Sequence, residues 1–291
     1  MAHALAIALT MLLALVSSLS VAQGAGAPVS IDLALWDVAA GREVKLASAV
    51  YSLAKADVVL AGESHDDPRH HAAQLAIIQA LRISDRPVAV GLEMFQHNDQ
   101  GSLDAWVAGK LSGEEMRAAF ARNWDAGLWP LYQPIFEYAR QEKIPLVGLN
   151  VPREITRQVA RQGFASLSPE QFGQLPPVVC IVDPEYEAFL RRVLGEHAKG
   201  HEFQRFCEAQ LVWDTAMAYY AGEFREANAG LTLVVLTGSV HAWKRAVPAQ
   251  LRKLHPELSS LSLLPGAPGG LEPAEVGPGD ADYLYLGQAP R

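Results

Sequence analysis

The 291-residue sequence is poor in cysteine and in positive charge. Lysines and arginines number 24 against 32 aspartates and glutamates, and the net charge of −8 gives no electrostatic support for a nucleic-acid partner. Only Cys180 and Cys207 are present, so one disulfide at most can form within the chain. In an oxidising compartment these two cysteines could pair. They could equally be small buried apolar side chains.

A long apolar run is also missing. The apolar stretch at residues 4–16 is shorter than the ~20 residues that a membrane span needs, and Ser20-Val21-Ala22 follows it. A short apolar stretch before a small-x-small site is typical of a secretory signal peptide, which predicts removal of residues 1–22 and a periplasmic or secreted protein. An uncleaved membrane anchor is the alternative. No cysteine follows the stretch, so a lipoprotein anchor has no attachment site, and we expect no stable membrane anchor.

The rest of the chain has a globular composition, with 50% hydrophobic and 19% charged residues. Residues 28–291 are predicted to form one α/β domain. Short continuous apolar runs are typical of buried strands, and they occur at residues 56–63, 86–95, 144–150 and 231–238. A helix is predicted between the first two runs, with Asp66 or Asp67 as its cap and Pro68 in its first turn. This order predicts a mainly parallel sheet flanked by helices.

The middle of the chain is predicted to be helical. Ser112 and Glu115 have the spacing of a capping box, and residues 131–143 form a helical pattern that leads into the third strand. Residues 153–229 contain no convincing buried strand, so we expect an inserted, smaller helical lobe there, interrupted by a loop at residues 167–177. Residues 265–282 are predicted to be a surface loop, and residues 283–287 an additional edge strand.

Polar side chains stand at the ends of the predicted strands. The runs "VVLAGESH" (58–65) and "VVLTGSVH" (234–241) both close with Gly-x-x-His. Ligands bind at the carboxyl ends of parallel strands, so we expect one crevice formed by Glu63, His65, Glu93 and His241. Two carboxylates and two imidazoles suit a divalent metal such as zinc or manganese, held by Glu63, His65 and His241. The same four residues suit acid–base catalysis. One of them alone could be only a hydrogen-bonded strand end, but four together favour a functional crevice.

Further residues are predicted to line or support this crevice. His70 and His71 begin the next helix, where the neutral imidazole is favoured, although a solvated polar face explains them equally well. Arg153 starts a helical stretch and could bind an anion, or it could be an exposed loop residue. Three more polar residues are predicted to orient the ligating side chains: Asn150, Gln210 and Asp214. The last two lie on an apolar helix face, where they could instead anchor the helix.

Together these motifs resemble the ChaN-like haem-binding uptake family, which is related to the TIKI proteases and the erythromycin esterases. The resemblance rests on "GESHDDPRHH", "GLEMF", "NWDAGLWPLYQPIFEYAR", "GLNVPRE", "AQLVWDTAMA" and "GSVH" followed by "VP". It implies a flanked sheet with a helical lobe, and haem binding in bacterial iron acquisition. In the wider superfamily the two histidines and the strand-end glutamates form a metal or hydrolytic centre, which corresponds here to Glu63, His65, Glu93 and His241. Val240 stands where the family usually has glycine.

Two functions follow as expectations. In the first, the protein is an exported haem-binding protein of bacterial iron uptake, and haem lies between the crevice and the helical lobe. The candidate haem contacts are Trp129, Tyr132, His71 and Arg153. A tyrosine or histidine could ligate the iron, and Arg153 could meet a propionate. The same aromatic residues could instead be ordinary core.

In the second, the protein is a metal-dependent hydrolase of esters or amides. Glu63, His65 and His241 hold the ion, and Glu93 is the general base that activates water. The sequence has no Gly-x-Ser-x-Gly motif, which removes the serine hydrolases of that type from consideration. Under either expectation the partner is haem or another small molecule, and a homodimer stays open.

Overall fold

The computed structural model describes residues 33–84, 86–178, 180–194, 200–266 and 270–288. The strands are β1 (Leu33–Asp37), β2 (Arg42–Lys45), β3 (Val58–Glu63), β4 (Val88–Gln96), β5 (Leu146–Asn150), β6 (Thr232–Gly238), β7 (Ser260–Pro265) and β8 (Tyr283–Gln288). The α-helices are α1 (Leu46–Leu53), α2 (Pro68–Ile83), α3 (Gln100–Val107), α4 (Gly113–Asn123), α5 (Trp129–Glu142), α6 (Arg153–Gln162), α7 (Pro169–Phe172), α8 (Pro184–Leu194), α9 (Gly200–Ala227), α10 (Ser239–Ala242) and α11 (Val247–Leu254). The 3-10 turns are η1 (His97–Asp99), η2 (Ala126–Leu128), η3 (Phe164–Ser166) and η5 (Pro273–Glu275). The predicted signal peptide, residues 1–22, lies outside the described residues.

The described strands form one eight-stranded sheet in the order β2-β1-β8-β7-β3-β6-β4-β5. Neighbouring strands from β8 to β5 are parallel, whereas β1 pairs antiparallel with both β8 and β2. All residues of β3 and β6 are buried, which is the pattern of central parallel strands covered on both faces. The predicted α/β class with a mainly parallel sheet is therefore confirmed.

One side of the sheet differs from the expectation. The sequence pattern does not predict β1, β2 or β7; β2 is largely exposed and has the sequence "REVK", which contains no apolar run. The prediction of an edge strand at residues 283–287 is wrong in its position. β8 lies between β1 and β7, because the N-terminal strand β1 pairs along its outer side.

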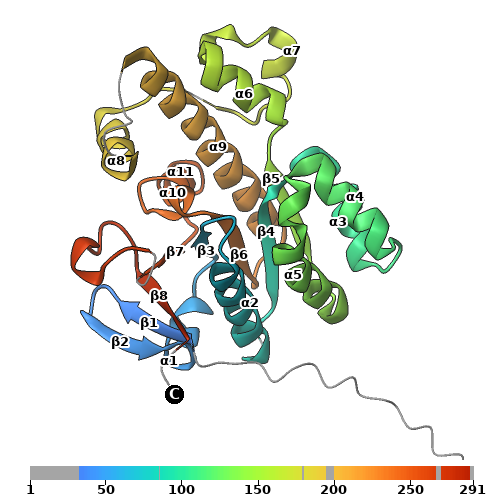
Figure 1. Ribbon diagram of the computed structural model, residues 1–291, viewed down its shortest axis with the longest axis vertical. Coiled ribbons are helices and arrows are strands. Elements are labelled where there is room, and N and C mark those ends of the chain that lie inside the picture. The colour runs from blue at the N-terminus through green and yellow to red at the C-terminus, as the bar shows by residue number, and fades with distance from the viewer. Residues whose placement is uncertain (1–32, 85, 179, 195–199, 267–269, 289–291) are drawn as a thin grey trace, which may run out of the picture.

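Helices cover both faces of the sheet (Figure 1). Val59 and Ala61 of β3 point into a core shared with α1, α2, α3, α4 and α5. Val58 and Leu60 of the same strand point into a second core, which is shared with α8, α9 and α11. This alternation along one strand is the two-residue period of extended backbone. The molecule is thus a three-layered arrangement of helices, sheet and helices.

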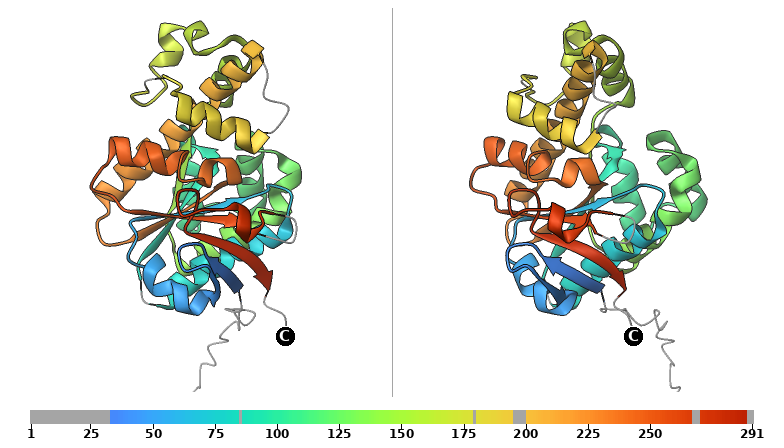
Figure 2. Two further views of the ribbon diagram at one scale, coloured as in Figure 1. Left: turned by 90° about the vertical axis from the view of Figure 1, so that its left-hand side faces the viewer. Right: turned by 60° about the vertical axis from the view of Figure 1, so that its left-hand side comes forward.

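Helices alone lie between β5 and β6 in the described residues. Figure 2 shows α6, α7 and the first part of α9 gathered beyond the carboxyl edge of the sheet. The rest of α9 packs on β5 and α11. Residues 167–177 are not loop throughout, because α7 begins within them. Its cap Ser168 accepts a hydrogen bond from the amide of Gln171, whose side chain bonds back to the Ser168 amide.

Two predicted helix starts are confirmed. Asp67 caps α2 by accepting a hydrogen bond from the amide of Arg69 at 2.9 Å, and Pro68 is the first helical residue. Ser112 and Glu115 form both halves of the capping box of α4. These local features are set by neighbours in the chain, so sequence alone locates them.

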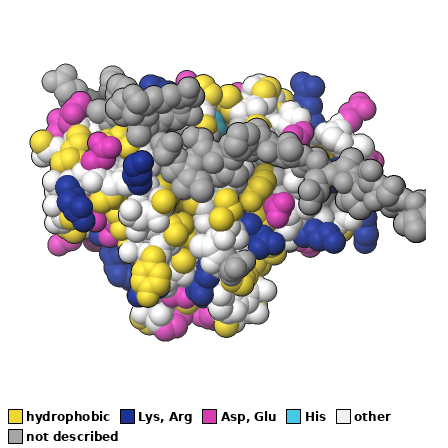
Figure 3. All heavy atoms as spheres, turned by 90° about the horizontal axis from the view of Figure 1, so that it is seen from below, with side chains coloured by type: hydrophobic (Ala, Val, Ile, Leu, Met, Phe, Trp, Pro, Cys, Tyr) yellow, Lys and Arg dark blue, Asp and Glu magenta, His cyan; other side chains and the backbone are white. Residues whose placement is uncertain are grey.

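Cys180 and Cys207 are free thiols in the structure. Among the described residues, no helix combines the length and the apolar character required to pass through a bilayer. Figure 3 shows basic and acidic side chains interspersed on the coloured part of the underside, so no patch of a single sign covers that part.

Candidate functional site

The two Gly-x-x-His segments lie side by side. β3 and β6 are parallel neighbours, and their register places Gly62 opposite Thr237 and Glu63 opposite Gly238. β4 pairs with the other side of β6, which brings Glu93 to the same edge. The strand-end residues therefore come from three adjacent strands, and they face the side on which α6 and α7 lie (Figure 1).

A tyrosine, a carboxylate and an imidazole form a chain at the end of β3. The Tyr132 hydroxyl of α5 donates a hydrogen bond to Glu63, and Nδ1 of His65 lies 2.8 Å from the same carboxylate oxygen. Burial alone would lower the pKa of His65, but the hydrogen bond to Glu63 and the charges of Glu93 and Glu63 outweigh it and raise the pKa to about 9. Burial and the Glu63 charge raise the pKa of Tyr132, so the phenol stays protonated and remains a donor.

A second chain of the same kind ends at the histidine of α10. Tyr186 of α8 donates to one oxygen of Asp214 at 2.5 Å, and the other oxygen lies 2.6 Å from Nδ1 of His241. Burial opposes protonation of His241, but the charges of Glu93 and Asp214 outweigh it and raise the pKa of the imidazole. Burial raises the pKa of Asp214, although contacts with His241 and Tyr186 oppose this shift.

Glu93 lies between the two histidines. One of its oxygens accepts hydrogen bonds from Thr237 Oγ1 at 2.7 Å and from the Gly238 amide at 2.6 Å, and the other lies 3.7 Å from Nε2 of His241. Burial alone would raise the pKa of Glu93, but the charges of His241 and His65 and these hydrogen bonds hold it below its usual value.

Gly238 allows this close approach. A Cβ atom at that position would lie 3.2 Å from Cε1 of His65 and 3.7 Å from Glu93. Val240, two residues later, is not among the described residues with positive φ, so its side chain does not strain the turn.

The residues predicted to support the ligating side chains differ in what they contact. Asn150 donates to the backbone oxygen of Glu93 at 2.7 Å, and Asp214 contacts His241 as described above. Gln210 is buried in α9. Nδ1 of His71 lies 3.3 Å from Glu63, and its Nε2 lies 3.0 Å from the backbone oxygen of His65. Both ring nitrogens of His71 therefore face groups of the strand-end segment at residues 63–65.

His70 is also held by the strand-end segment. Its Nδ1 accepts a hydrogen bond from the Ser64 amide at 2.9 Å, which fixes a neutral tautomer. Burial lowers the pKa of His70, although the charge of Asp67 opposes this shift. The neutral imidazole expected from the sequence agrees with these contacts.

The predicted haem contacts do not form one open surface. Trp129 and Tyr132 are buried, at 5% and 0% exposure, and they pack against Phe120. Arg153 lies over the ring of Trp124 at 5.8 Å, and that ring meets His65 edge-on at 5.2 Å. Tyr186 and Thr237 join the site without having been predicted. Thr237 adjoins the second Gly-x-x-His segment, but no local pattern marks Tyr186.

The ligand atoms of the three predicted metal ligands do not all lie within 4.8 Å of one another. In the described part of the chain, one set of three potential ligands has all its ligand atoms within 4.8 Å of one another, and Glu63, His65 and His241 do not belong to it. The divalent metal at the strand ends therefore stays a prediction.

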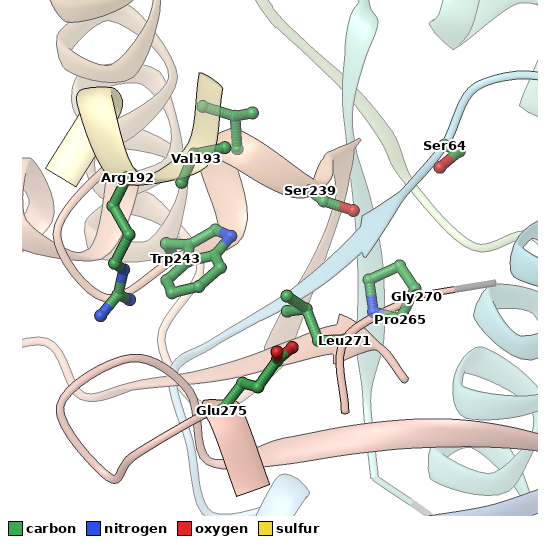
Figure 4. A pocket seen from close by; sticks show the side chains of 10 residues that line it. Ser64, Arg192, Val193, Ser239, Trp243, Pro265, Gly270, Leu271 and Glu275 are labelled. Carbon is green, nitrogen blue, oxygen red and sulfur yellow. The ribbon is translucent and has the colours of Figure 1, made fainter. Parts of the chain in front are cut away.

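A pocket of about 480 Å³ opens beside the strand ends (Figure 4). Its described lining comprises Ser64, Arg192, Val193, Ser239, Val240, Trp243, Pro265, Gly270, Leu271 and Glu275. Trp243 presents its ring to this space with Arg192 beside it, while Leu271 and Glu275 lie opposite. Ser239 also donates to the backbone oxygen of Glu63 at 2.9 Å, which links the pocket wall to the buried site.

Residues 49–251, more than half of the chain, match the family model described as "Haem-binding uptake, Tiki superfamily, ChaN". The chain belongs to this family. Its fold is similar to that of ChaN of Campylobacter jejuni in a structure of cofacial haem binding, with 20% identity, a TM-score of 0.67, and coverage of 89% of this chain and 98% of that one. At that level of identity the likeness establishes the fold alone.

More distant similarities extend to other proteins. The type III effector HopBA1 is 13% identical, with 83% and 92% of the two chains covered and a TM-score of 0.47. The erythromycin esterase EreC in its open conformation is 15% identical, with 84% and 80% covered and a TM-score of 0.44. The chloroplastic protein RETICULATA-RELATED 5 of Arabidopsis thaliana is 27% identical over 122 residues, 40% of this chain. The match spans only 16% of that curated relative.

In this ChaN-family chain, both histidines have one nitrogen committed to a carboxylate. Nδ1 faces Glu63 in His65 and Asp214 in His241, so Nε2 is the nitrogen left for proton transfer or for binding a metal ion. The side chain of His65 is 37% exposed, whereas that of His241 is 6% exposed. His65 is therefore the more accessible of the two imidazoles.

Proposed function

We propose that the protein binds haem in the pocket beside the strand ends and takes part in haem uptake after export. The observation that carries the proposal is the pocket itself, together with family membership. Its volume of about 480 Å³ lies in the range of small-molecule sites, ~300–1,000 Å³. Trp243, Val240 and Leu271 supply an apolar lining suited to a flat macrocycle.

The described lining supports a site for the apolar body of a porphyrin and one propionate. Arg192 carries a guanidinium at the pocket wall, bonded to Asp280 at 2.6 Å and lying over Trp243 at 4.8 Å, so its orientation is held. A propionate would receive its remaining donors. No imidazole, phenol or thiol belongs to the described lining. His65, the residue after Ser64, would be the side chain to hold the iron, because its Nδ1 is taken by Glu63 and its side chain is 37% exposed.

Haemin titration with paired variants tests the pocket. A saturable Soret shift is expected for the mature protein. Val240→Trp should abolish it by filling the pocket, and Arg192→Gln should weaken binding. Arg191→Gln is the matched control, because Arg191 is the preceding residue of α8, is similarly exposed, and pairs with Glu187 outside the pocket. Equal haemin affinity for Val240→Trp and the wild type would contradict the proposal.

Export rests on residues 1–22, whose short apolar stretch and small-x-small site suit a signal peptide. A periplasmic or secreted location would bring the protein into contact with haem from outside the cell. Deletion of the gene should then reduce growth on haem as the sole iron source, while growth on a ferric salt stays unchanged. Equal growth on both sources contradicts the uptake role without bearing on haem binding itself.

A hydrolase is the second candidate, and the paired Tyr–carboxylate–His chains favour it. The raised pKa of His65 keeps its imidazole protonated at neutral pH, so it can donate a proton to a leaving group. Glu93, whose pKa is lowered, stays ionised beside it and can accept one. Ester and amide hydrolysis should be assayed with the wild type and with Glu93→Gln, in the presence and absence of a chelator. Activity that survives Glu93→Gln excludes the strand-end centre as its source.

A further inference from the structure

A second group of polar side chains lies at the opposite edge of the sheet. Glu226 is in the last turn of α9, just before the chain enters β6, and His255 and Glu257 lie between the end of α11 and the start of β7. The pocket and the strand-end histidines are at the carboxyl ends of these same strands. This group, defined as the Glu226–His255–Glu257 cluster, is therefore distinct from the site described above.

The three side chains have the spacing of metal ligands. Nδ1 of His255 lies 2.6 Å from a Glu226 oxygen and 3.9 Å from a Glu257 oxygen, and all three ligand atoms fall within 4.8 Å of one another. A single Nδ1–H group can satisfy one carboxylate at a time. A cation bound to Nδ1 would satisfy both.

The imidazole of His255 is buried, with Nδ1 directed into the cluster. The His255 side chain is only 6% exposed, and its Nε2 is buried without a hydrogen-bond partner. The ring rests on the backbone of α9 at Gly222, where a Cβ atom would lie 2.1–2.5 Å from three ring atoms. Gly222 therefore creates the space for the ring, and little side-chain entropy remains to be lost when Nδ1 binds a ligand.

The electrostatic surroundings favour a cation. Glu226 and Glu257 are 51% and 57% exposed, so a hydrated ion can reach them from solvent and keep water in its remaining positions. The carboxyl ends of α9 and α11 both lie at this place, and the negative ends of helix dipoles stabilise positive charge. The two carboxylates carry a charge that matches a divalent ion.

We propose that Glu226, His255 and Glu257 bind a divalent first-row transition-metal ion, with Zn²⁺ as the representative. One nitrogen and two carboxylate oxygens are ligands that Zn²⁺ accepts, and solvent completes the coordination. The bound ion joins the end of α9 to the segment after α11. It therefore links the helix that packs along β5 to the connection into β7.

The test measures Zn²⁺ binding to the mature protein by equilibrium dialysis, with a visible spectrum of the Co²⁺ form as a second readout. The decisive variant is Glu226→Gln/Glu257→Gln, because both residues are exposed and neither substitution changes side-chain volume. Glu223→Gln, on the same helix and also exposed, is the matched control.

The wild type and Glu223→Gln should each bind one more equivalent of Zn²⁺ than the double variant, and each single variant should weaken that site by at least about tenfold. Zn²⁺ should also raise the Tm of the wild type more than that of the double variant, since a ligand of the folded state stabilises it. Equal stoichiometry and affinity for the wild type and the double variant would overturn the proposal. Haemin binding should be the same in all these variants, so the outcome is independent of the proposed function.

Discussion

Asp214 and His241 lie 27 residues apart in the chain, and their side chains meet at 2.6 Å. Tyr186 donates to the other oxygen of Asp214. The same order of phenol, carboxylate and imidazole occurs in Tyr132 of α5, Glu63 at the end of β3, and His65. Glu93 stands between the two imidazoles and influences the pKa of both. The strand-end site therefore consists of two similar proton-donor chains around one shared carboxylate.

Asp214→Asn should lower the pKa of His241, because the charge and the hydrogen bond of Asp214 both stabilise the imidazolium. An NMR titration of the imidazole signals measures the shift. The pKa of His65 should change much less, since Glu63 and Glu93 are the residues that raise it. A larger shift at His65 than at His241 would contradict the assignment of the two chains.

Tyr132→Phe and Tyr186→Phe should each reduce the free energy of unfolding by about 1–3 kcal/mol, because each removes a buried hydrogen bond from a phenol to a carboxylate. Tyr51→Phe is the control, with a side chain exposed at 68% and an expected change within about 0.5 kcal/mol. Urea unfolding gives the three values. If Tyr51→Phe lowers the free energy of unfolding as much as Tyr132→Phe and Tyr186→Phe do, the two buried hydroxyl groups do not stabilise the fold through their hydrogen bonds.

The stability contributed by His65 should fall as the pH rises. The pKa of this imidazole is raised from 6.5 to about 9 on folding, so the folded state binds the proton more tightly. The contribution is full below pH 6.5 and is lost between pH 6.5 and about 9. The unfolding midpoints at pH 6.5 and at about pH 9 should differ more for the wild type than for His65→Gln. His201 is exposed, and the control His201→Gln should show the same difference between the two pH values as the wild type.

Haemin affinity should rise with pH if His65 holds the haem iron. The iron competes with a proton for Nε2, and the pKa of about 9 means that the proton prevails at neutral pH. Soret titrations at pH 7 and pH 9 are expected to show tighter binding at the higher value, with no such gain for His65→Ala. A gain that persists in His65→Ala assigns the iron to another residue.

The mature protein should begin near Gln23, after cleavage behind Ala22. N-terminal sequencing of protein recovered from the periplasmic or secreted fraction identifies the first residue. Changing Ala22 to Arg should block cleavage, because the site requires small side chains. Protein that retains Met1 in the cytosolic fraction would exclude export.

Local pattern was sufficient for the central part of the fold. The apolar runs ending in Glu63 and Gly238 have the composition of strands buried on both faces, and the caps Asp67 and Ser112 act through residues two or three positions away. Such signals are complete within a short segment. The exposed strand β2 gave no such signal, because its residues are not selected by burial.

The strand-end residues were also predictable as a group, because parallel strands end at a common edge. The tyrosines that donate hydrogen bonds to these groups were not predictable as partners. Tyr186 reaches Asp214 across 28 residues and Tyr132 reaches Glu63 across 69, through the packing of α8 against α9 and of α5 near the sheet. A contact between residues so far apart in the sequence leaves no periodic pattern within either segment.

Sequence alone therefore determined the central strands β3, β4, β5 and β6 and the starts of α2 and α4, and which acids and histidines stand at the strand ends. Tertiary structure decided that β3 and β6 are neighbours, that Trp129 and Tyr132 are buried instead of open to a ligand, and that the pocket forms beside Trp243. The physical reason is the range of the forces concerned. Secondary structure responds to neighbours along the chain, whereas burial and contact between distant side chains arise only when the layers pack together.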